Sequence, residues 1–281
     1  MAGRFILISV FLVILCGCGP QISKTRPICP GSDSVSEALS RLELQKDGTL
    51  SFRANGQCRL DYFEKGKAKR ENFPVKFWVD GPSQIRFWGD VLFNSKGIDL
   101  GSNEEEFWFG LKPKELGNSY YWGRWSEQSG IRGLVIDPKL LLETLGVVRI
   151  KDEAGWILSN EGPYDILTQR DARNVMIRRI YIYSCDYRVS KIEYFDDKHE
   201  VAVVAELEYK KKFRGISTAN FIRITTGSDE QELKFSITLN SIKPFEFDQE
   251  KQKVYFGRKE PKGFKNEYRI VNGKAYKEQG Q

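Results

Sequence analysis

The sequence predicts a mainly β protein of the α+β class, with a single antiparallel sheet of about 10–11 strands and two or three short helices. Three observations predict this class. Long segments alternate apolar and polar side chains, most clearly at 201–209 and 233–239, so each such strand buries one face. Turn signals rich in Gly and Asp separate these segments, and only two windows have helical spacing. No internal repeat or linker divides residues 33–248, which predicts one domain.

The N-terminus has the features of a secretion signal. Arg4 precedes an apolar run over 5–15 that is too short to span a bilayer. The run ends in Leu15-Cys16-Gly17-Cys18, which resembles the lipobox that bacterial lipoprotein signal peptidase recognises. We therefore expect residues 1–17 to be a signal peptide and Cys18 to be the lipidated first residue of the mature protein. Cys16 is a competing position, and an ordinary secretory signal is the alternative.

The lipid on Cys18 implies a protein anchored to a membrane without spanning it, because two acyl chains already make anchoring stable. Gly19 favours the periplasmic face of the outer membrane, but the underlying rule does not hold in every lineage, so the inner membrane stays open. Residues 18–32 are a tether rich in Pro, Gly and Ser. Ser32-Asp33-Ser34 then caps a helix whose apolar positions are Val35, Ala38, Leu39 and Leu42.

Strands follow in the first half of the domain. Residues 75–79 alternate and end in the turn signal Asp80-Gly81-Pro82, and 85–93 form the return strand. Further strands are expected at 106–111 and 120–125.

A second helix is expected in mid-chain. Asp137 is a suitable N-cap, Pro138 suits the first helical position, a Leu-rich run follows, and Gly146 fits the C-cap. The rest of the domain reads as a meander of strands at 156–159, 164–169, 174–186, 188–195, 201–210, 221–226 and 232–239.

The net charge of +6 lies at the C-terminal end, where residues from Lys251 onward include nine Lys or Arg and three Glu. We expect residues 249–281 to be a basic, poorly ordered tail. Contact with anionic lipid headgroups is the alternative role of this tail. An exported lipoprotein does not meet nucleic acid, so nucleic acid is excluded as a partner.

Three cysteines remain in the mature chain besides Cys18. We expect a disulfide between Cys29 and Cys58, which would join the N-terminal segment to the first strand, and a single buried thiol at Cys185. The alternative is that all three are unpaired core residues. No metal site and no cofactor are predicted, because His199 is the only histidine and lies in a polar turn.

Several segments together resemble the LolA/LolB superfamily of bacterial lipoprotein carriers and acceptors. Residues 77–82 leading into 85–90 resemble the paired early strands of the family, and 101–104 leading into Phe107-Trp108-Phe109 resemble its strand after a polar turn. Ile136-Asp137-Pro138 before the Leu run resembles its central helix. The similarity extends over most of residues 33–248, by pattern rather than by an invariant motif.

This resemblance implies a sheet curled into an unclosed half-barrel, with the helices covering its concave face. It also implies an apolar cavity that holds acyl chains, which large uncharged aromatic side chains suit. The membrane-contacting loop of LolB-type acceptors would have its counterpart near 91–95. The candidate cavity residues are Trp78, Phe87, Trp88, Phe107, Trp108, Phe109, Tyr121, Trp122, Leu141 and Leu145. The alternative is that these side chains only pack the core and the helices.

The function that follows is a non-enzymatic, membrane-anchored lipoprotein that binds the acyl chains of a lipid or lipoprotein client in the cell envelope. A periplasmic carrier protein is a further expected partner. The alternative is a structural or interaction lipoprotein of the same fold, which docks a protein on a strand edge. An enzyme is disfavoured, because the chain has no Gly-x-Ser-x-Gly elbow, no histidine for a triad and no Gly-rich phosphate loop.

Overall fold

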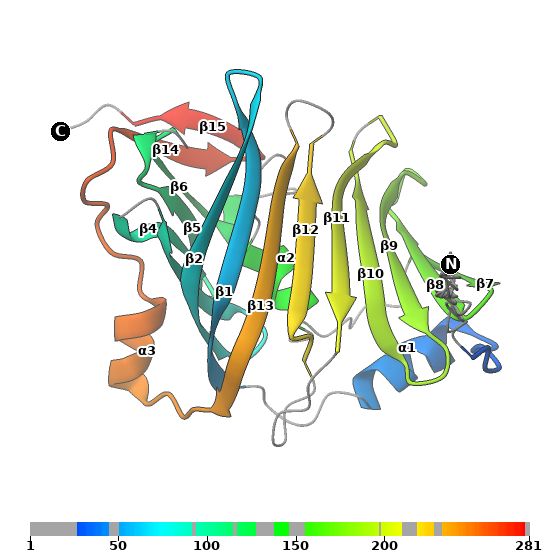
Figure 1. Ribbon diagram of the computed structural model, residues 1–281. Coiled ribbons are helices and arrows are strands. Elements are labelled where there is room, and N and C mark those ends of the chain that lie inside the picture. The colour runs from blue at the N-terminus through cyan, green and yellow to red at the C-terminus, as the bar shows by residue number, and fades with distance from the viewer. Residues whose placement is uncertain are drawn as a thin grey trace, which may run out of the picture.

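The computed structural model describes residues 27–44, 51–91, 94–114, 117–127, 138–145, 155–196, 198–209, 218–227 and 232–278. The expected signal peptide, Cys18, and Leu92 and Phe93 of the expected membrane-contacting loop lie outside these residues. The first half of the chain contains α1 (Val35–Leu44), β1 (Ser51–Glu64), β2 (Lys67–Asp80), β3 (Gln84–Val91), β4 (Asn94–Ser102), β5 (Glu106–Leu111), β6 (Ser119–Arg124), the short 3-10 helix η2 (Trp125–Glu127) and α2 (Pro138–Thr144) (Figure 1).

The second half contains β7 (Trp156–Glu161), β8 (Tyr164–Arg170), β9 (Met176–Tyr183), β10 (Arg188–Phe195), β11 (Val201–Glu208), β12 (Phe221–Thr226), β13 (Leu233–Pro244), α3 (Gln249–Phe256), β14 (Asn266–Val271) and β15 (Lys274–Lys277).

The described strands form one open sheet. Its order is β15-β14-β6-β5-β4-β3-β2-β1-β13-β12-β11-β10-β9-β8-β7, so β15 and β7 are the two edges. All pairs are antiparallel except β14 with β6, which is parallel. The predicted single, unclosed, mainly β sheet is confirmed. It has fifteen strands among the described residues rather than ten or eleven, and β4, β14 and β15 lie where no strand was expected.

The sheet has one continuous apolar face, and β1 shows how the sequence produces it. Alternate side chains of this strand are buried, among them Phe52, Cys58 and Leu60, while those between are more exposed. Phe52 lies opposite Val79 of β2, and Leu60 lies opposite Phe235 of β13. Because paired residues point to the same face, the apolar face continues across both neighbours.

Two helices cover this face, which is the concave side of the half-barrel. Ala38, Leu39 and Leu42 of α1 belong to the same hydrophobic core as the strands, and α1 contacts β7 and β8. The leucines of α2 join the core in the middle of the sheet, and α2 lies behind the strands in Figure 1. The prediction that short helices cover the concave face is confirmed by α1 and α2.

The third helix lies on the opposite, convex side. Trp78 stands between the buried Phe77 and Val79 in β2 and therefore faces away from the core, and Tyr255 of α3 stacks on it at 5.0 Å between ring centroids. From α3 the chain runs along this side to β14, which adds to the sheet beside β6. The C-terminal segment therefore covers part of the convex face.

The expectation of a poorly ordered tail from residue 249 is wrong. Residues 249–256 form α3, whose N-cap Asp248 accepts a hydrogen bond from the backbone N–H of Lys251, and β14 and β15 follow. The prediction relied on the positive charge of this segment, but a few apolar side chains are enough to dock it on the sheet. Phe256 is 2% exposed and Ile270 is 4% exposed.

The expected cysteine pairing is also wrong. Cys29 forms a disulfide with Cys185, with their Cα atoms 5.0 Å apart, and Cys58 is a free, buried thiol. The reason is the path of the N-terminal segment, which runs beside β8 and β9 and not beside β1. Ser184 donates a hydrogen bond to the backbone carbonyl oxygen of Cys29. Cys185 itself lies in the turn after β9, which ends at Tyr183.

The described helices have at most ten residues. Among the residues that the structure describes, no helix is long and apolar enough to cross a membrane.

Candidate functional site

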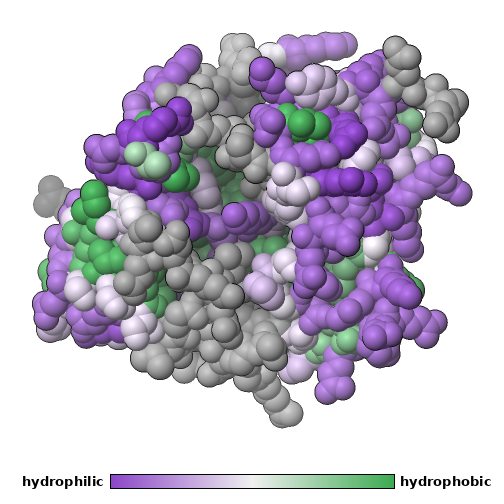
Figure 2. All heavy atoms as spheres, turned by 180° about the vertical axis from the view of Figure 1, so that it is seen from behind, coloured by the Kyte–Doolittle hydropathy of each residue, from purple (hydrophilic) through white to green (hydrophobic). Residues whose placement is uncertain are grey.

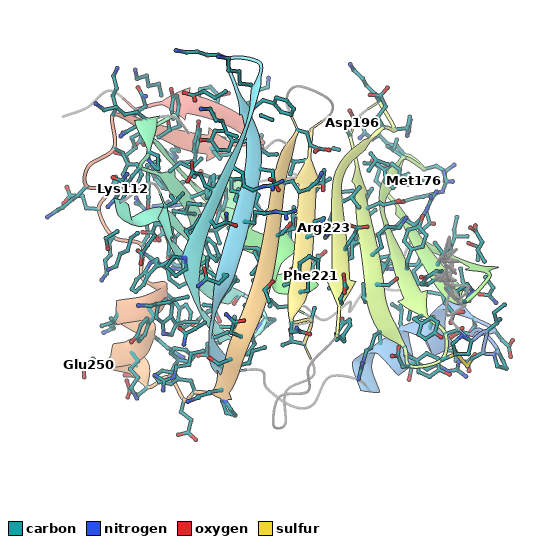
Figure 3. The ribbon with its side chains drawn as sticks, viewed as in Figure 1. Lys112, Met176, Asp196, Phe221, Arg223 and Glu250 are labelled. Carbon is teal, nitrogen blue, oxygen red and sulfur yellow. A yellow bond between two sulfur atoms is a disulfide. The ribbon has the colours of Figure 1, made fainter. Side chains whose placement is uncertain are left out.

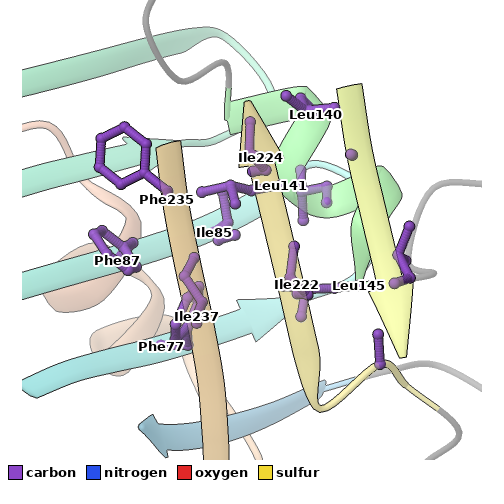
Figure 4. Close-up of a cluster of buried hydrophobic side chains, with 14 of the residues drawn as sticks. Phe77, Ile85, Phe87, Leu140, Leu141, Leu145, Ile222, Ile224, Phe235 and Ile237 are labelled. Atoms are coloured by element: carbon purple, nitrogen blue, oxygen red, sulfur yellow. The ribbon is translucent and has the colours of Figure 1, made fainter. Parts of the chain in front are cut away.

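The centre of the concave face is occupied by α2. Leu141 and Leu145 point into a cluster that includes Ile85 and Phe87 from β3 and Ile222 from β12 (Figure 4). Burying a leucine side chain contributes about 1.5–3 kcal/mol. A helix of seven residues is marginal by itself, so contacts with the sheet hold α2 in place.

Five of the ten predicted cavity residues belong to the hydrophobic core on this face or pack against it. Phe87, Phe109, Leu141 and Leu145 are buried in one core cluster, and the partly buried Tyr121 packs against it. They come from β3, β5, β6 and α2, which are distant in sequence. The structure therefore brings half of the predicted set together on the concave side.

Phe107 shares the concave face with Phe109 but lies outside that cluster. Its ring contacts Trp125 at 4.7 Å between centroids. The absence of a side chain at Gly123 makes room for it, because a Cβ there would lie 2.8 Å from the Phe107 ring.

The remaining four predicted residues, the tryptophans, lie on the other face of the sheet, which corrects the prediction. Trp78 and Trp88 alternate with Phe77 and Phe87, which face the core. Trp108 alternates in the same way with Phe107 and Phe109, so it also faces the convex side. Trp122 lies opposite Trp108 in the pairing of β5 with β6 and faces the same side. Side chains at successive positions of a strand point to opposite faces, so the tryptophans and phenylalanines cannot line one cavity.

A polar cluster ties α2 to the second half of the sheet. Glu143, on α2, forms an ion pair with Arg178 of β9 at 2.6 Å and accepts a hydrogen bond from the hydroxyl of Tyr194 on β10. Arg178 also donates to Gln169 of β8 at 2.8 Å and lies over the ring of Trp156. The Glu143 side chain is 8% exposed and the Arg178 side chain is 14% exposed.

The charges of this cluster stabilise each other. Burial acts to lower the pKa of Arg178, but Glu143 and Tyr194 outweigh it and raise the pKa above the ordinary value. The guanidinium is therefore held in its charged form beside the carboxylate. Thr218, from the segment before β12, adds a hydrogen bond to the backbone carbonyl oxygen of Leu145 at 2.8 Å. We call Glu143, Arg178 and Tyr194 the α2 latch.

The concave side of the molecule has a hollow (Figure 2). Figure 2 views the molecule from this side and shows a hollow between its two flanks, with hydrophobic atoms inside it. An apolar surface recessed between polar rims is the arrangement that binding sites for hydrophobic ligands use.

The latch residues were not among the predicted site residues. One signal in the sequence pointed to them, because Glu143 interrupts the Leu-rich run of the central helix with a carboxylate. A carboxylate on the buried side of a helix needs a partner. No sequence pattern identified Arg178 and Tyr194 as those partners, since both lie in ordinary strands.

No metal chemistry is indicated in the part of the chain that the structure describes, where no group of three or more His, Cys, Asp or Glu side chains is placed to hold a metal ion. His199 is exposed in the turn between β10 and β11.

The sequence and the fold were compared with those of known proteins. No protein-family model matches the sequence, and no curated protein matches it. Solved structures do match. A LolA superfamily protein, NE2245 from Nitrosomonas europaea, is 12% identical with a TM-score of 0.51 over 80% of this chain and 98% of its own.

Two further structures agree equally well. A putative outer membrane lipoprotein-sorting protein domain from Vibrio parahaemolyticus has a TM-score of 0.53 at 12% identity, over 80% of this chain and 100% of its own. A DUF1329 family protein from Desulfovibrio piger has a TM-score of 0.52 at 12% identity, over 80% of this chain and 98% of its own. The open sheet, the helices on its concave face and these matches together show that the chain has the LolA/LolB-like fold.

Proposed function

We propose that the protein is a non-enzymatic lipoprotein, anchored by lipid on Cys18, that binds the acyl chains of a lipid or lipoprotein client on its concave face. One observation carries this proposal. The concave face is apolar from Phe109 on β5 to Leu167 on β8, and the two-turn helix α2 crosses its centre. If α2 moves aside, a client chain gains an apolar surface that is already formed.

The α2 latch supports this reading. The leucines pack α2 on the core, and the polar contacts of Glu143 join it to strands of the other half of the sheet. Such contacts are directional and specify one position of α2, which gives the helix a defined closed state in the empty protein. In this proposal α2 occupies the acyl site in the empty protein and leaves it on loading.

The cellular place of the proposed function is the periplasmic face of the outer membrane, with a periplasmic carrier as the donor of the client. The disulfide between Cys29 and Cys185 supports an oxidising compartment. The structural relative from Vibrio parahaemolyticus is described as an outer membrane lipoprotein-sorting domain, which fits the same class of activity.

The test uses the mature chain with Cys18→Ser, so that its own lipid cannot enter the site. Native mass spectrometry and lipid extraction would report an acyl ligand that copurifies or is taken up from added lipopeptide. We expect Glu143→Gln to weaken the latch and to increase uptake at least about threefold, since a loss of about 0.7 kcal/mol has that effect. Glu206→Gln is the matched control, because Glu206 forms an exposed ion pair with Arg223 on the convex face.

A protein with no acyl ligand, and with no uptake by either variant, would contradict the proposal. One observation favours a second function in that case, an interaction lipoprotein of the same fold. The concave core is already filled by α2, and Ile157 is 51% exposed on the edge strand β7, where a partner strand can add.

A further inference from the structure

A pocket of about 400 Å³ lies on the convex side of the sheet. Its floor is formed by side chains of β3, β4 and β6, and its outer wall by residues 259–264, which lead from α3 to β14. Lys112, at the end of β5, lies beside this wall (Figure 3). The volume falls in the range of small-molecule sites, and the pocket is separated from the acyl site by the sheet itself.

The pocket is strongly basic. Five of its side chains are cationic, namely Arg86, Lys96, Lys112, Lys259 and Lys262, against the two carboxylates of Asp99 and Glu260. A pocket with this excess of positive charge attracts anions, because low-dielectric walls concentrate the field inside it.

Arg86 lines the pocket and is incompletely paired. The residue is 2% exposed, and its Nη2 donates to Asp99 Oδ2 at 2.6 Å. Its Nε and Nη1 are buried and have no hydrogen-bond partner among the described residues. Burial lowers the pKa of Arg86, against the opposing effect of the neighbouring Asp99. Two unused donors of one guanidinium form the fork that oxyanions accept in a bidentate way.

Aromatic rings shape the pocket around this arginine. Arg86 lies 4.9 Å from the centroid of the Trp108 ring, and Lys96 Nζ lies 4.1 Å from the centroid of the Trp88 ring. Trp108 lies over Gly101, where a Cβ would be 2.2 Å from its indole, so the backbone is shaped to receive the ring. The cations are thus held at fixed places by packing instead of being spread over the surface.

We propose that this pocket binds a phosphate group, with Arg86 as the buried ligand and Lys96, Lys259 and Lys262 as the charges at its mouth. A phosphate group presents several acceptor oxygens, with a charge near −2 in a monoester and −1 in a diester, and these oxygens suit a guanidinium fork surrounded by lysines. The phosphate can be that of a soluble ester or that of a lipid headgroup. This site goes beyond the proposed acyl binding, since it lies on the opposite face of the sheet.

The experiment compares three forms of the mature chain with Cys18→Ser. The pocket variant carries Lys96→Gln, Lys259→Gln and Lys262→Gln, which are exposed positions where the change leaves the core intact. The control variant carries Lys76→Gln, Lys274→Gln and Lys277→Gln, which are exposed positions outside the pocket with the same change in net charge. Isothermal titration calorimetry measures the binding of inorganic phosphate. Cosedimentation measures binding to vesicles of phosphatidylcholine with or without phosphatidylglycerol.

We expect the parent protein to bind phosphate, the pocket variant to bind it at least about tenfold more weakly, and the control to stay within about twofold. Binding of free phosphate without a preference for phosphatidylglycerol supports a soluble ester as the ligand. A preference for phosphatidylglycerol vesicles that the pocket variant loses supports a lipid phosphate. The proposal is overturned if the parent binds neither probe, or if the control variant is weakened as much as the pocket variant.

Discussion

Two buried ion pairs differ in what they do in this protein. The pair of Glu143 and Arg178 is completed by Tyr194 and Gln169, so its polar atoms have partners on three strands. The pair of Arg86 and Asp99 leaves two guanidinium nitrogens without partners among the described residues. Burial raises the pKa of Asp99, against the opposing effects of Arg86, Trp108 and Trp88. A buried pair of this kind contributes little net stability, but it is costly to break.

Removing the carboxylate of Asp99 tests this cost. We expect Asp99→Asn to lower the free energy of unfolding by about 3 kcal/mol in phosphate-free buffer, because it leaves the guanidinium of Arg86 buried without a counter-charge. Urea unfolding followed by circular dichroism measures the change. Asp61→Asn is the control, since Asp61 pairs with the largely exposed Arg59 and Arg70, and a surface pair contributes at most about 1 kcal/mol. Equal changes in the free energy of unfolding for the two substitutions would contradict the claim that burial makes the Arg86–Asp99 pair costly to break.

Cys58 offers a second test at the scale of a residue. Burial raises the pKa of its thiol, and Asp61 adds to that effect. Since the thiolate is the reactive form, we expect no reaction of the folded chain with a thiol reagent. In denaturant the mature chain with Cys18→Ser should expose one thiol without reductant and three with it. A peptide map that links Cys29 to Cys58 would contradict the pairing described above.

The elements differ in how far the sequence predicts them. β11 and β13 alternate apolar and polar side chains, because one face of each is buried, and both were predicted within a few residues. β4 was missed, since the sequence Asn94–Ser102 has two glycines and few strand-forming residues and is a strand through its pairing with β3 and β5. α3, β14 and β15 were missed for a similar reason, because their stability comes from docking on a distant surface.

The candidate site, too, depends on contacts that the local sequence does not reveal. Periodicity predicts that Phe87 and Trp88 point to opposite faces of a strand, but it does not say which face is concave. The apolar side chains on both faces of β3 and β5 were in fact a signal that something covers each face. On one side that cover is α2, as the resemblance implied. On the other side the cover is the C-terminal segment, which was expected to be poorly ordered because of its basic composition.

The docking of α3 can be tested on neighbouring residues of one helix. Tyr255 stacks on Trp78, whereas Val254 is 47% exposed. We expect Tyr255→Ala to destabilise the protein by about 1–2 kcal/mol and to shift tryptophan emission to longer wavelength, because it removes a stacked ring and exposes Trp78 to water. Val254→Ala should change stability by less than about 0.5 kcal/mol and leave the emission unchanged. If Tyr255→Ala behaves as Val254→Ala does, the stacking does not hold α3 in place.

For the whole molecule, the first and last described segments lie at opposite ends of one sheet. The N-terminal segment lies beside β8 and β9, and β15 forms the opposite edge. The disulfide between Cys29 and Cys185 joins positions 156 residues apart, so it encloses most of the strands. A crosslink over so long a loop restricts the unfolded chain strongly.

The stabilising effect of this crosslink is expected to be about 2–5 kcal/mol. The double variant Cys29→Ser and Cys185→Ser should therefore unfold at a lower urea concentration than the oxidised parent. The parent measured with reductant should match the variant, because both lack the same bond. A variant as stable as the oxidised parent would show that contacts of the N-terminal segment, such as the bond from Ser32 N–H to Asp165, fix it without the disulfide.

The two proposed sites share one sheet but face opposite directions, as the neighbours Arg86 and Phe87 show. A close-packed sheet transmits a signal between its faces only if it has a second arrangement to switch to. The described residues show one arrangement, so we expect the sites to act independently. The pocket variant with three Lys→Gln substitutions should take up acyl ligand within about twofold of the parent, and Glu143→Gln should bind phosphate within about twofold. A larger change in either measurement would mean that acyl loading and phosphate binding are coupled, by a free energy equal to RT times the logarithm of that factor.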